Sequence, residues 1–159
     1  MAVDAGTVVL RCCLATAMLD CNPGYFLSAG GGPKGPSTPM PLVEMQASLR
    51  ERARDLEAEF QRSCGCAVAV RFDDIVLQSR DMTGDMESVL ADIGIDVGLG
   101  CNNAPSKNTI YCKMTTLEVV LVNQPGLATA SFKDGVATAM VYPHDPFHFE
   151  TVERAIGPY

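Results

Sequence analysis

Hydrophobic side chains recur at every third or fourth position over residues 41–63, and many of the positions between them are charged. The members of this stripe are Leu42, Met45, Leu49, Ala53, Leu56 and Phe60. Side chains at this spacing lie on one face of an α-helix, so the pattern predicts a long amphipathic helix that buries this face in a core. Gly65 follows where a helix commonly closes on a left-handed residue.

The next hydrophobic pattern has the two-residue period of strands. β-forming residues alternate over residues 66–72, residues 73–74 supply a turn, and residues 75–78 return, which predicts a short hairpin. Later runs of β-forming residues, separated by turn-forming ones, predict further strands at residues 109–114, 117–122, 127–132 and 136–142. The Asp-Gly pair in residues 133–135 is the strongest turn signal, because these residues readily take the positive φ of a tight hairpin.

Helical spacing also returns between the predicted hairpin and the later strands. Thr83 is expected to cap a brief helix whose buried face carries Met86, Val89, Leu90 and Ile93. Gly94 followed by Ile95 is typical of a Schellman motif, in which a glycine ends the helix and the next apolar residue packs back on it. We therefore expect a short strand at residues 95–99, followed by a loop. A final helix is expected over residues 145–157, with an Asp-Pro start and a Gly-Pro end.

Together these elements predict an α+β domain with a mainly antiparallel sheet of about five strands, packed by two or three helices in a two-layer sandwich. The expected order is α-β-β-α-β-β-β-α, after an N-terminal segment. Over residues 41–157 this order resembles the α-β sandwich of the roadblock and profilin-like adaptor families. Similar layouts occur in secretion chaperones and in some small enzymes, so the resemblance concerns the fold and does not fix the function.

Composition divides the chain into three parts. Residues 28–40 are rich in Gly and Pro, which oppose both helix and sheet, and they predict a flexible linker or an exposed loop. This linker separates an N-terminal segment, residues 1–27, from a single α+β domain at residues 41–159. The segment is too short to fold alone and is expected to dock on the domain or on another subunit. Within it, residues 7–20 fit either a helix or a strand that runs into a helix.

The chain carries a formal net charge of −7, and its acidic residues concentrate between residues 73 and 96. An acidic surface repels phosphate backbones, so we expect no nucleic-acid partner. No apolar run approaches the roughly 18 residues that a membrane span requires, and we expect no membrane partner. The acidic stretch is interpreted as a solvated surface, with a patch for a basic partner as the alternative.

Seven cysteines are many for a chain of 159 residues, and an odd number leaves at least one unpaired. This fits a secreted disulfide framework poorly. The N-terminal apolar run contains Arg11 and has no basic segment before it, so it does not match a signal peptide. The sequence therefore predicts reduced thiols in an intracellular, cytoplasmic protein.

Two small groups of side chains are candidates for chemistry. Cys64-Gly65-Cys66 could share a soft metal ion or form a reactive thiol pair, although burial as small apolar side chains is the favoured interpretation. His144 and His148 lie four positions apart, a spacing that can chelate a metal on a helix. The Asp-Pro pair between them is expected to start a helix, which leaves His144 outside it. We therefore expect no cofactor and assign no catalytic or metal-binding role beyond these low-ranked candidates.

These observations lead to one functional hypothesis with two alternatives. The favoured function is a non-catalytic protein-binding or assembly subunit, adaptor-like or chaperone-like. It is expected to form a homodimer or to bind a protein partner through a sheet edge or a helix face. The first alternative is a small thiol- or metal-dependent enzyme that uses Cys64 and Cys66 with His144 or His148. The second alternative is a small-molecule sensor domain.

Overall fold

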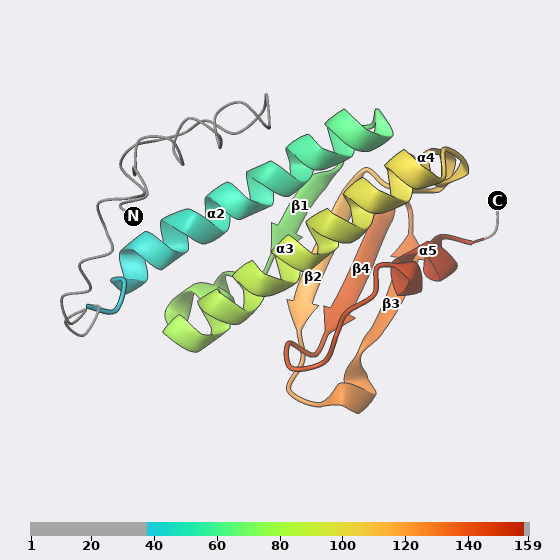
Figure 1. Cartoon of the computed structure of the whole chain (residues 1–159). Helices are drawn as coiled ribbons and strands as arrows, with labels where there is room; N and C mark the ends of the chain where they lie inside the picture. Colours follow the sequence, from blue (N-terminus) through green and yellow to red (C-terminus); the bar gives the residue numbers. More distant parts are fainter. Residues whose placement is uncertain (1–37, 158–159) are drawn as a thin grey trace, which may run out of the picture. The chain divides into compact units, whose positions relative to one another are not determined.

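The computed structural model describes residues 38–157, and those from Met40 onward belong to one compact unit (Figure 1). Predictions for the N-terminal segment and most of the linker lie outside the described residues. The helices are α2 (Leu42–Glu59, continued by a π-helical turn at Phe60–Cys64), α3 (Arg80–Asn103), α4 (Ser106–Tyr111) and α5 (Glu150–Ile156). The strands are β1 (Ala69–Phe72), β2 (Thr116–Leu121), β3 (Thr129–Lys133) and β4 (Val136–Val141). Short 3₁₀ turns lie at Asp74–Gln78 and Pro125–Leu127.

The four described strands form one mixed sheet in the order β1-β2-β4-β3. β1 and β2 are parallel, with Ala69 opposite Thr116, and β2 and β4 are parallel, with Thr116 opposite Val136. The β3–β4 pair is antiparallel and closes where Lys133 lies opposite Val136. The α+β class is therefore confirmed. The structure differs from the expected sheet, since it has four described strands rather than five and two of its three pairings are parallel.

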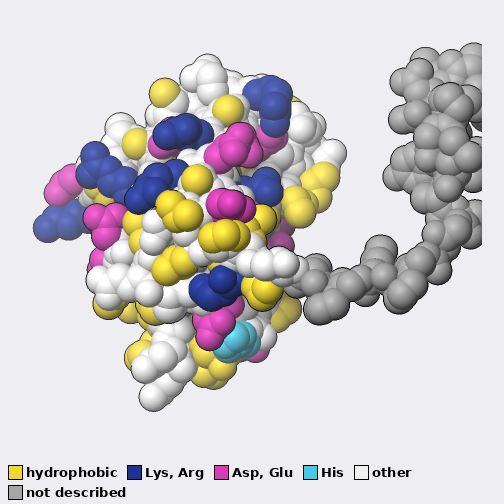
Figure 2. Space-filling view, turned by 90° about the vertical axis from the view of Figure 1, so that its left-hand side faces the viewer, with side chains coloured by type: hydrophobic (Ala, Val, Ile, Leu, Met, Phe, Trp, Pro, Cys, Tyr) yellow, Lys and Arg dark blue, Asp and Glu magenta, His cyan; other side chains and the backbone are white. Residues whose placement is uncertain are grey.

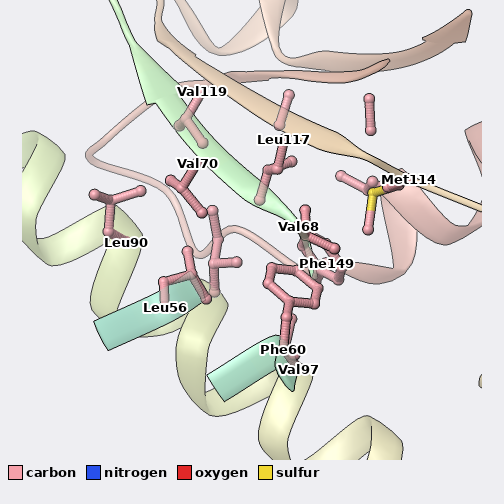
Figure 3. Close-up of a cluster of buried hydrophobic side chains, with 14 of the residues drawn as sticks. Leu56, Phe60, Val68, Val70, Leu90, Val97, Met114, Leu117, Val119 and Phe149 are labelled. Atoms are coloured by element: carbon pink, nitrogen blue, oxygen red, sulfur yellow. The ribbon is translucent and has the colours of Figure 1, made fainter. Parts of the chain in front are cut away.

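Strand residues alternate between a buried face and an exposed face of the sheet. Leu117 and Val119 of β2 are fully buried, whereas Glu118 between them is exposed. α2 and α3 lie side by side across the buried face, and α5 packs near β3 and β4 (Figure 1). Figure 3 shows the core between the layers, where Leu56 and Phe60 of α2 lie among the inward side chains of the strands. The domain thus has a helical layer on a sheet layer.

α2 and α3 run parallel to each other, as contacts at both ends of the pair show. Near their N-terminal ends, Ser48 Oγ donates a hydrogen bond to Glu87 Oε1 at 2.8 Å. Near their C-terminal ends, a disulfide joins Cys64 to Cys101, with the two Cα atoms 5.3 Å apart. The relative position of the two helices is therefore held at both ends.

The hairpin expected after α2 is wrong. Residues 75–78 form a 3₁₀ turn, and β1 pairs with the distant β2 instead. Asp73 caps this turn through its side chain, and Ser79 caps α3 through its hydroxyl group. Thr83, expected as the helix cap, is fully buried and donates from Oγ1 to Val76 O at 2.7 Å. Side-chain hydrogen bonds to the backbone therefore stabilise a tight turn where alternation favoured a strand.

Two other predicted strands are helical in the structure. Residues 95–99 belong to α3, which continues through Gly94 without ending in a Schellman motif. Val97 and Cys101 extend the buried face of α3 at helical spacing, and their burial outweighs the low helix propensity of glycine. Most of residues 109–114 lie in α4 and the turn after it. The buried side chains of that stretch are Ile110, Tyr111 and Met114.

The long helix and the last three strands are confirmed, with small shifts at their ends. Gly65 has a φ of 75°, as expected for a residue that closes a helix in the left-handed region. In the β3–β4 hairpin, Asp134 and Gly135 have φ values of 51° and 81°. The last helix begins at Glu150, later than expected, and the preceding Phe149 is buried and donates its backbone N–H to the side chain of Asp96 at 3.0 Å.

Candidate functional site

The structure separates the side chains that the sequence grouped as candidates for chemistry. Cys64 is bonded to Cys101, and Cys66 is bonded to Cys112. The prediction of reduced thiols is therefore wrong for the four described cysteines. A sulfur atom in a disulfide is not a thiolate, so Cys64 and Cys66 provide neither a nucleophile nor metal ligands in this state.

His144 and His148 line two different hollows on the surface. His144 packs edge-on against the ring of Tyr142, at a centroid distance of 5.2 Å, and lies beside Arg80 and Asp81 at the start of α3. His148 borders a cleft between α3, α4 and α5. Within the described residues, no group of three or more His, Cys, Asp or Glu side chains could hold a metal ion. The histidines and cysteines therefore do not converge on one site.

The cleft beside His148 has a volume of about 350 Å³. Glu153 lines it, is 8% exposed, and accepts hydrogen bonds from Lys107 Nζ at 2.9 Å and from the hydroxyl of Tyr111. Tyr111 is fully buried. These contacts tie α4 to α5 and satisfy a buried carboxylate. The fold itself therefore explains the polar cluster in this cleft.

A larger groove, of about 600 Å³, runs between α2 and α3. We call it the α2–α3 groove. Its α3 wall consists of Leu90, Ala91, Gly94, Ile95, Gly98 and Leu99. Ile95 and Leu99 lie one helical turn apart and are 60% and 58% exposed. Neighbouring exposed apolar side chains are one feature of surfaces that another protein covers.

The two glycines of this wall have different surroundings. A Cβ atom at Gly98 would lie 2.8 Å from Glu59 Oε1, so the carboxylate at the end of this flexible side chain would have to shift. A Cβ atom at Gly94 would lie 3.8 Å from Leu56 Cδ1, an ordinary contact. Glycine inside a helix is about 1 kcal/mol less favourable than alanine, and the packing of α2 on α3 does not require it at position 94. Its missing side chain leaves a recess beside Ile95.

The α2 wall of the groove is charged but neutral overall. Arg52 pairs with Asp55 at 3.9 Å, and Arg62 pairs with Glu59. Both pairs join neighbours on the same helix, and the four formal charges cancel. The groove therefore has an apolar α3 wall and an α2 wall without net charge.

Basic and acidic side chains are also intermixed at the end of the domain where α2 and α3 begin. Figure 2 shows them among hydrophobic side chains on that face. Exposed apolar side chains at this end include Met40, Val43 and Ile75. Met40 and Val43 follow within five residues of the first described residue, Thr38.

Because the sequence predicts a strand at residues 95–99, it gives no indication of a groove between α2 and α3 there. In a strand, Ile95 and Leu99 would be part of the sheet, whereas in α3 they are exposed on one helix face with the half-buried Ala91. The signal that reveals the groove is helical spacing that continues past Gly94 to the buried Cys101.

Comparisons with known proteins give no further assignment. No family model, curated protein or solved structure matches the chain. Among the described helices, none has the length and apolar character needed to cross a membrane.

Proposed function

We propose that this domain is a non-catalytic protein-binding and assembly subunit, adaptor-like in role, that forms a homodimer through the α2–α3 groove. The observation that carries the proposal is the exposure of Ile95 and Leu99, at 60% and 58%, beside a recess in the same helix. Covering the part of each side chain that is still exposed supplies about 1–2 kcal/mol for each residue.

A second copy of the chain suits this surface because the patch offers both a protrusion and a recess. Ile95 and Leu99 protrude, and Gly94 leaves a hollow beside them. In a two-fold symmetric dimer both subunits contribute the same patch. The protruding side chains of each subunit can therefore fill the recess of the other. The small side chains of the α3 wall also allow two helix axes to approach closely.

Charge favours the groove over the rest of the surface as a place for self-association. The chain has a formal net charge of −7, which makes two copies repel each other. The ion pairs Arg52–Asp55 and Arg62–Glu59 cancel the charges along the α2 wall. Two copies that meet there bring together walls without net charge.

The helix face is better suited to self-association than either edge of the sheet. At the β1 edge, the backbone N–H of Val70 already donates to Glu57 Oε1 at 2.9 Å. At the other edge, β3 has five residues and ends at Lys133. Short edge strands, edge lysines and occupied backbone donors all discourage pairing with another strand.

Sedimentation velocity of the full chain, from low to high micromolar concentration, tests the proposal. We expect the wild-type chain to form a dimer as concentration rises. The double variant Ile95→Asp/Leu99→Asp places two charges in the groove. We expect the dissociation constant of its dimer to be at least about 30-fold higher than that of the wild type, which is the effect of losing a central hot spot. Both side chains are exposed, so circular dichroism should show an unchanged fold.

Leu127→Asp is the matched control. Leu127 is 49% exposed and lies in the 3₁₀ turn before β3, outside the groove. It undergoes the same change from an aliphatic side chain to a carboxylate, and we expect this variant to dimerise as the wild type does. A wild-type chain that stays monomeric throughout, or a double variant that dimerises normally, contradicts the proposal.

The enzyme alternative has less support, because Cys64 and Cys66 are bonded to other cysteines and the histidines line separate hollows. The lack of nucleic-acid and membrane partners stays a prediction. The cytoplasmic location also stays a prediction, and the two disulfides favour an oxidising compartment over it. Alkylation of the protein in its native source, followed by mass analysis without reduction, distinguishes these locations.

A further inference from the structure

The two disulfides of the domain differ in their exposure to solvent. Cys64 and Cys101 are 5% and 4% exposed and belong to the hydrophobic core. Cys112 is exposed, and its partner Cys66 is half-buried. In thiol–disulfide exchange a thiolate must reach one of the bonded sulfur atoms, so access governs the rate. The residues of the Cys66–Cys112 bond are therefore more accessible to an external thiol than those of the buried bond.

The exposed bond joins the segments that lead into the first two strands. Cys66 lies just before β1 and Cys112 just before β2, and the first residues of these strands, Ala69 and Thr116, are register partners. The bond thus fastens the start of edge strand β1 to the neighbouring β2. The buried bond instead joins the C-terminal ends of α2 and α3. Opening the exposed bond releases one attachment of β1 and leaves the helix pair joined.

We propose that Cys66–Cys112 is a site of reversible thiol–disulfide exchange with a low-molecular-weight thiol of the glutathione class, whereas Cys64–Cys101 stays closed in the folded protein. The incoming thiolate attacks Cys112 Sγ and forms a mixed disulfide there. The bond between the two protein sulfurs breaks, and Cys66 Sγ leaves with the electron pair and takes up a proton from water.

A second thiol completes the reduction of the site. Its thiolate attacks the small-molecule sulfur of the mixed disulfide on Cys112, which releases the oxidised small molecule and the Cys112 thiolate. Two thiols are oxidised to one disulfide, and the two electrons reduce the protein bond. The oxidised small molecule reverses the sequence. Lys113, exposed and next to Cys112, favours the approach of an anionic thiolate.

Differential alkylation of the full chain tests this assignment. Folded protein is incubated with graded concentrations of reduced glutathione, quenched with a first alkylating agent, then unfolded, reduced and treated with a second one. Trypsin places Cys101 in the peptide of residues 81–107 and Cys112 in the peptide of residues 108–113, so one peptide reports each bond. We expect Cys112 to acquire the first label or glutathione at least about tenfold faster than Cys101, which requires opening of the core.

Two variants make the result specific. Cys66→Ala/Cys112→Ala removes the exposed bond, and Cys101 should still label slowly, which shows that its protection does not depend on the other disulfide. Lys113→Glu leaves both bonds in place, lengthens the tryptic peptide of Cys112 to residues 108–133, and should slow labelling of Cys112 without changing that of Cys101. Equal labelling rates at Cys101 and Cys112 in the wild type, or labelling of Cys112 only after denaturation, would overturn the proposal. Neither result depends on whether the chain dimerises.

Discussion

Among single residues, Glu153 holds the last helix to the rest of the domain. Its carboxylate is 8% exposed and accepts hydrogen bonds from Lys107 Nζ and from the buried hydroxyl of Tyr111. A buried carboxylate without donors would be strongly unfavourable, so the two donors from α4 are what allow it there. The carboxylate in turn gives the hydroxyl of the fully buried Tyr111 a hydrogen-bond acceptor.

We expect Glu153→Gln to lower the free energy of unfolding by about 1–3 kcal/mol, because the amide keeps an acceptor but loses the charge that faces Lys107. Urea unfolding followed by circular dichroism measures this change. Glu150→Gln is the matched control in the same helix, since Glu150 is exposed and pairs with Arg154 at 3.4 Å. That variant should change stability by less than about 0.5 kcal/mol. Equal losses in both variants would contradict the structural role of Glu153.

At the scale of secondary-structure elements, the glycines of α3 decide how closely its neighbours approach. A Cβ atom at Gly100 would lie 2.8 Å from the hydroxyl of Tyr111 in α4. Tyr111 is fully buried and its hydroxyl is hydrogen-bonded to Glu153, so its ring has no free space to move into. At Gly94 the nearest atom would be Leu56 Cδ1, at 3.8 Å.

The two alanine variants at these positions should therefore have opposite effects. We expect Gly100→Ala to lower the free energy of unfolding by about 1–3 kcal/mol through overpacking. Gly94→Ala should raise the free energy of unfolding of the monomer by up to about 1 kcal/mol, because alanine has a higher helix propensity than glycine. It should also weaken the proposed dimer, because the methyl group fills the recess beside Ile95. Unfolding at low protein concentration and sedimentation at high concentration separate the two effects. A Gly94→Ala variant that dimerises more tightly would contradict the proposed interface.

Elements that depend on local sequence could be predicted, whereas those that depend on distant contacts could not. The stripe of α2 and the Asp134-Gly135 turn have local causes, helical spacing and positive φ, and both are confirmed. Residues 95–99 continue a helix because Val97 and Cys101 are buried, which a local glycine signal does not reveal. Residues 75–78 form a turn because the backbone N–H of Ile75 donates to Asp73 Oδ1 and the backbone carbonyl of Val76 accepts from Thr83 Oγ1 of α3.

The parallel pairings and the disulfides also lie beyond local sequence. β1 pairs with β2 although α3 and α4 lie between them in the sequence, and β2 pairs with β4 although β3 lies between them in the sequence. Cysteine counts alone do not give connectivity, so the pairing of Cys64 with Cys101 and of Cys66 with Cys112 could not be derived from spacing. The α2–α3 groove follows from the same contacts, which explains why the candidate site differs from the side chains singled out in the sequence.

For the whole molecule, the net charge of −7 opposes the association of two copies, and this predicts the salt dependence of the dimer. Salt screens the repulsion between like-charged molecules, whereas the neutral walls of the groove offer few charges to pair across the interface. We expect dimerisation to become several-fold tighter when sodium chloride is raised from low to near-molar concentration. Sedimentation equilibrium at two salt concentrations measures this effect. A dimer that weakens with salt would indicate ion pairs between subunits and would contradict a neutral interface.

The position of β4 between β2 and β3 has a consequence for the growing polypeptide during translation. All four described cysteines and strands β1, β2 and β3 are synthesised before β4. Until residues 136–141 emerge, β2 and β3 have no strand to join them, so the nascent chain holds an incomplete sheet. Both cross-links join residues that precede β4 in the sequence, so they can close in that interval, and β4 then inserts between β2 and β3 of a body that is already covalently joined.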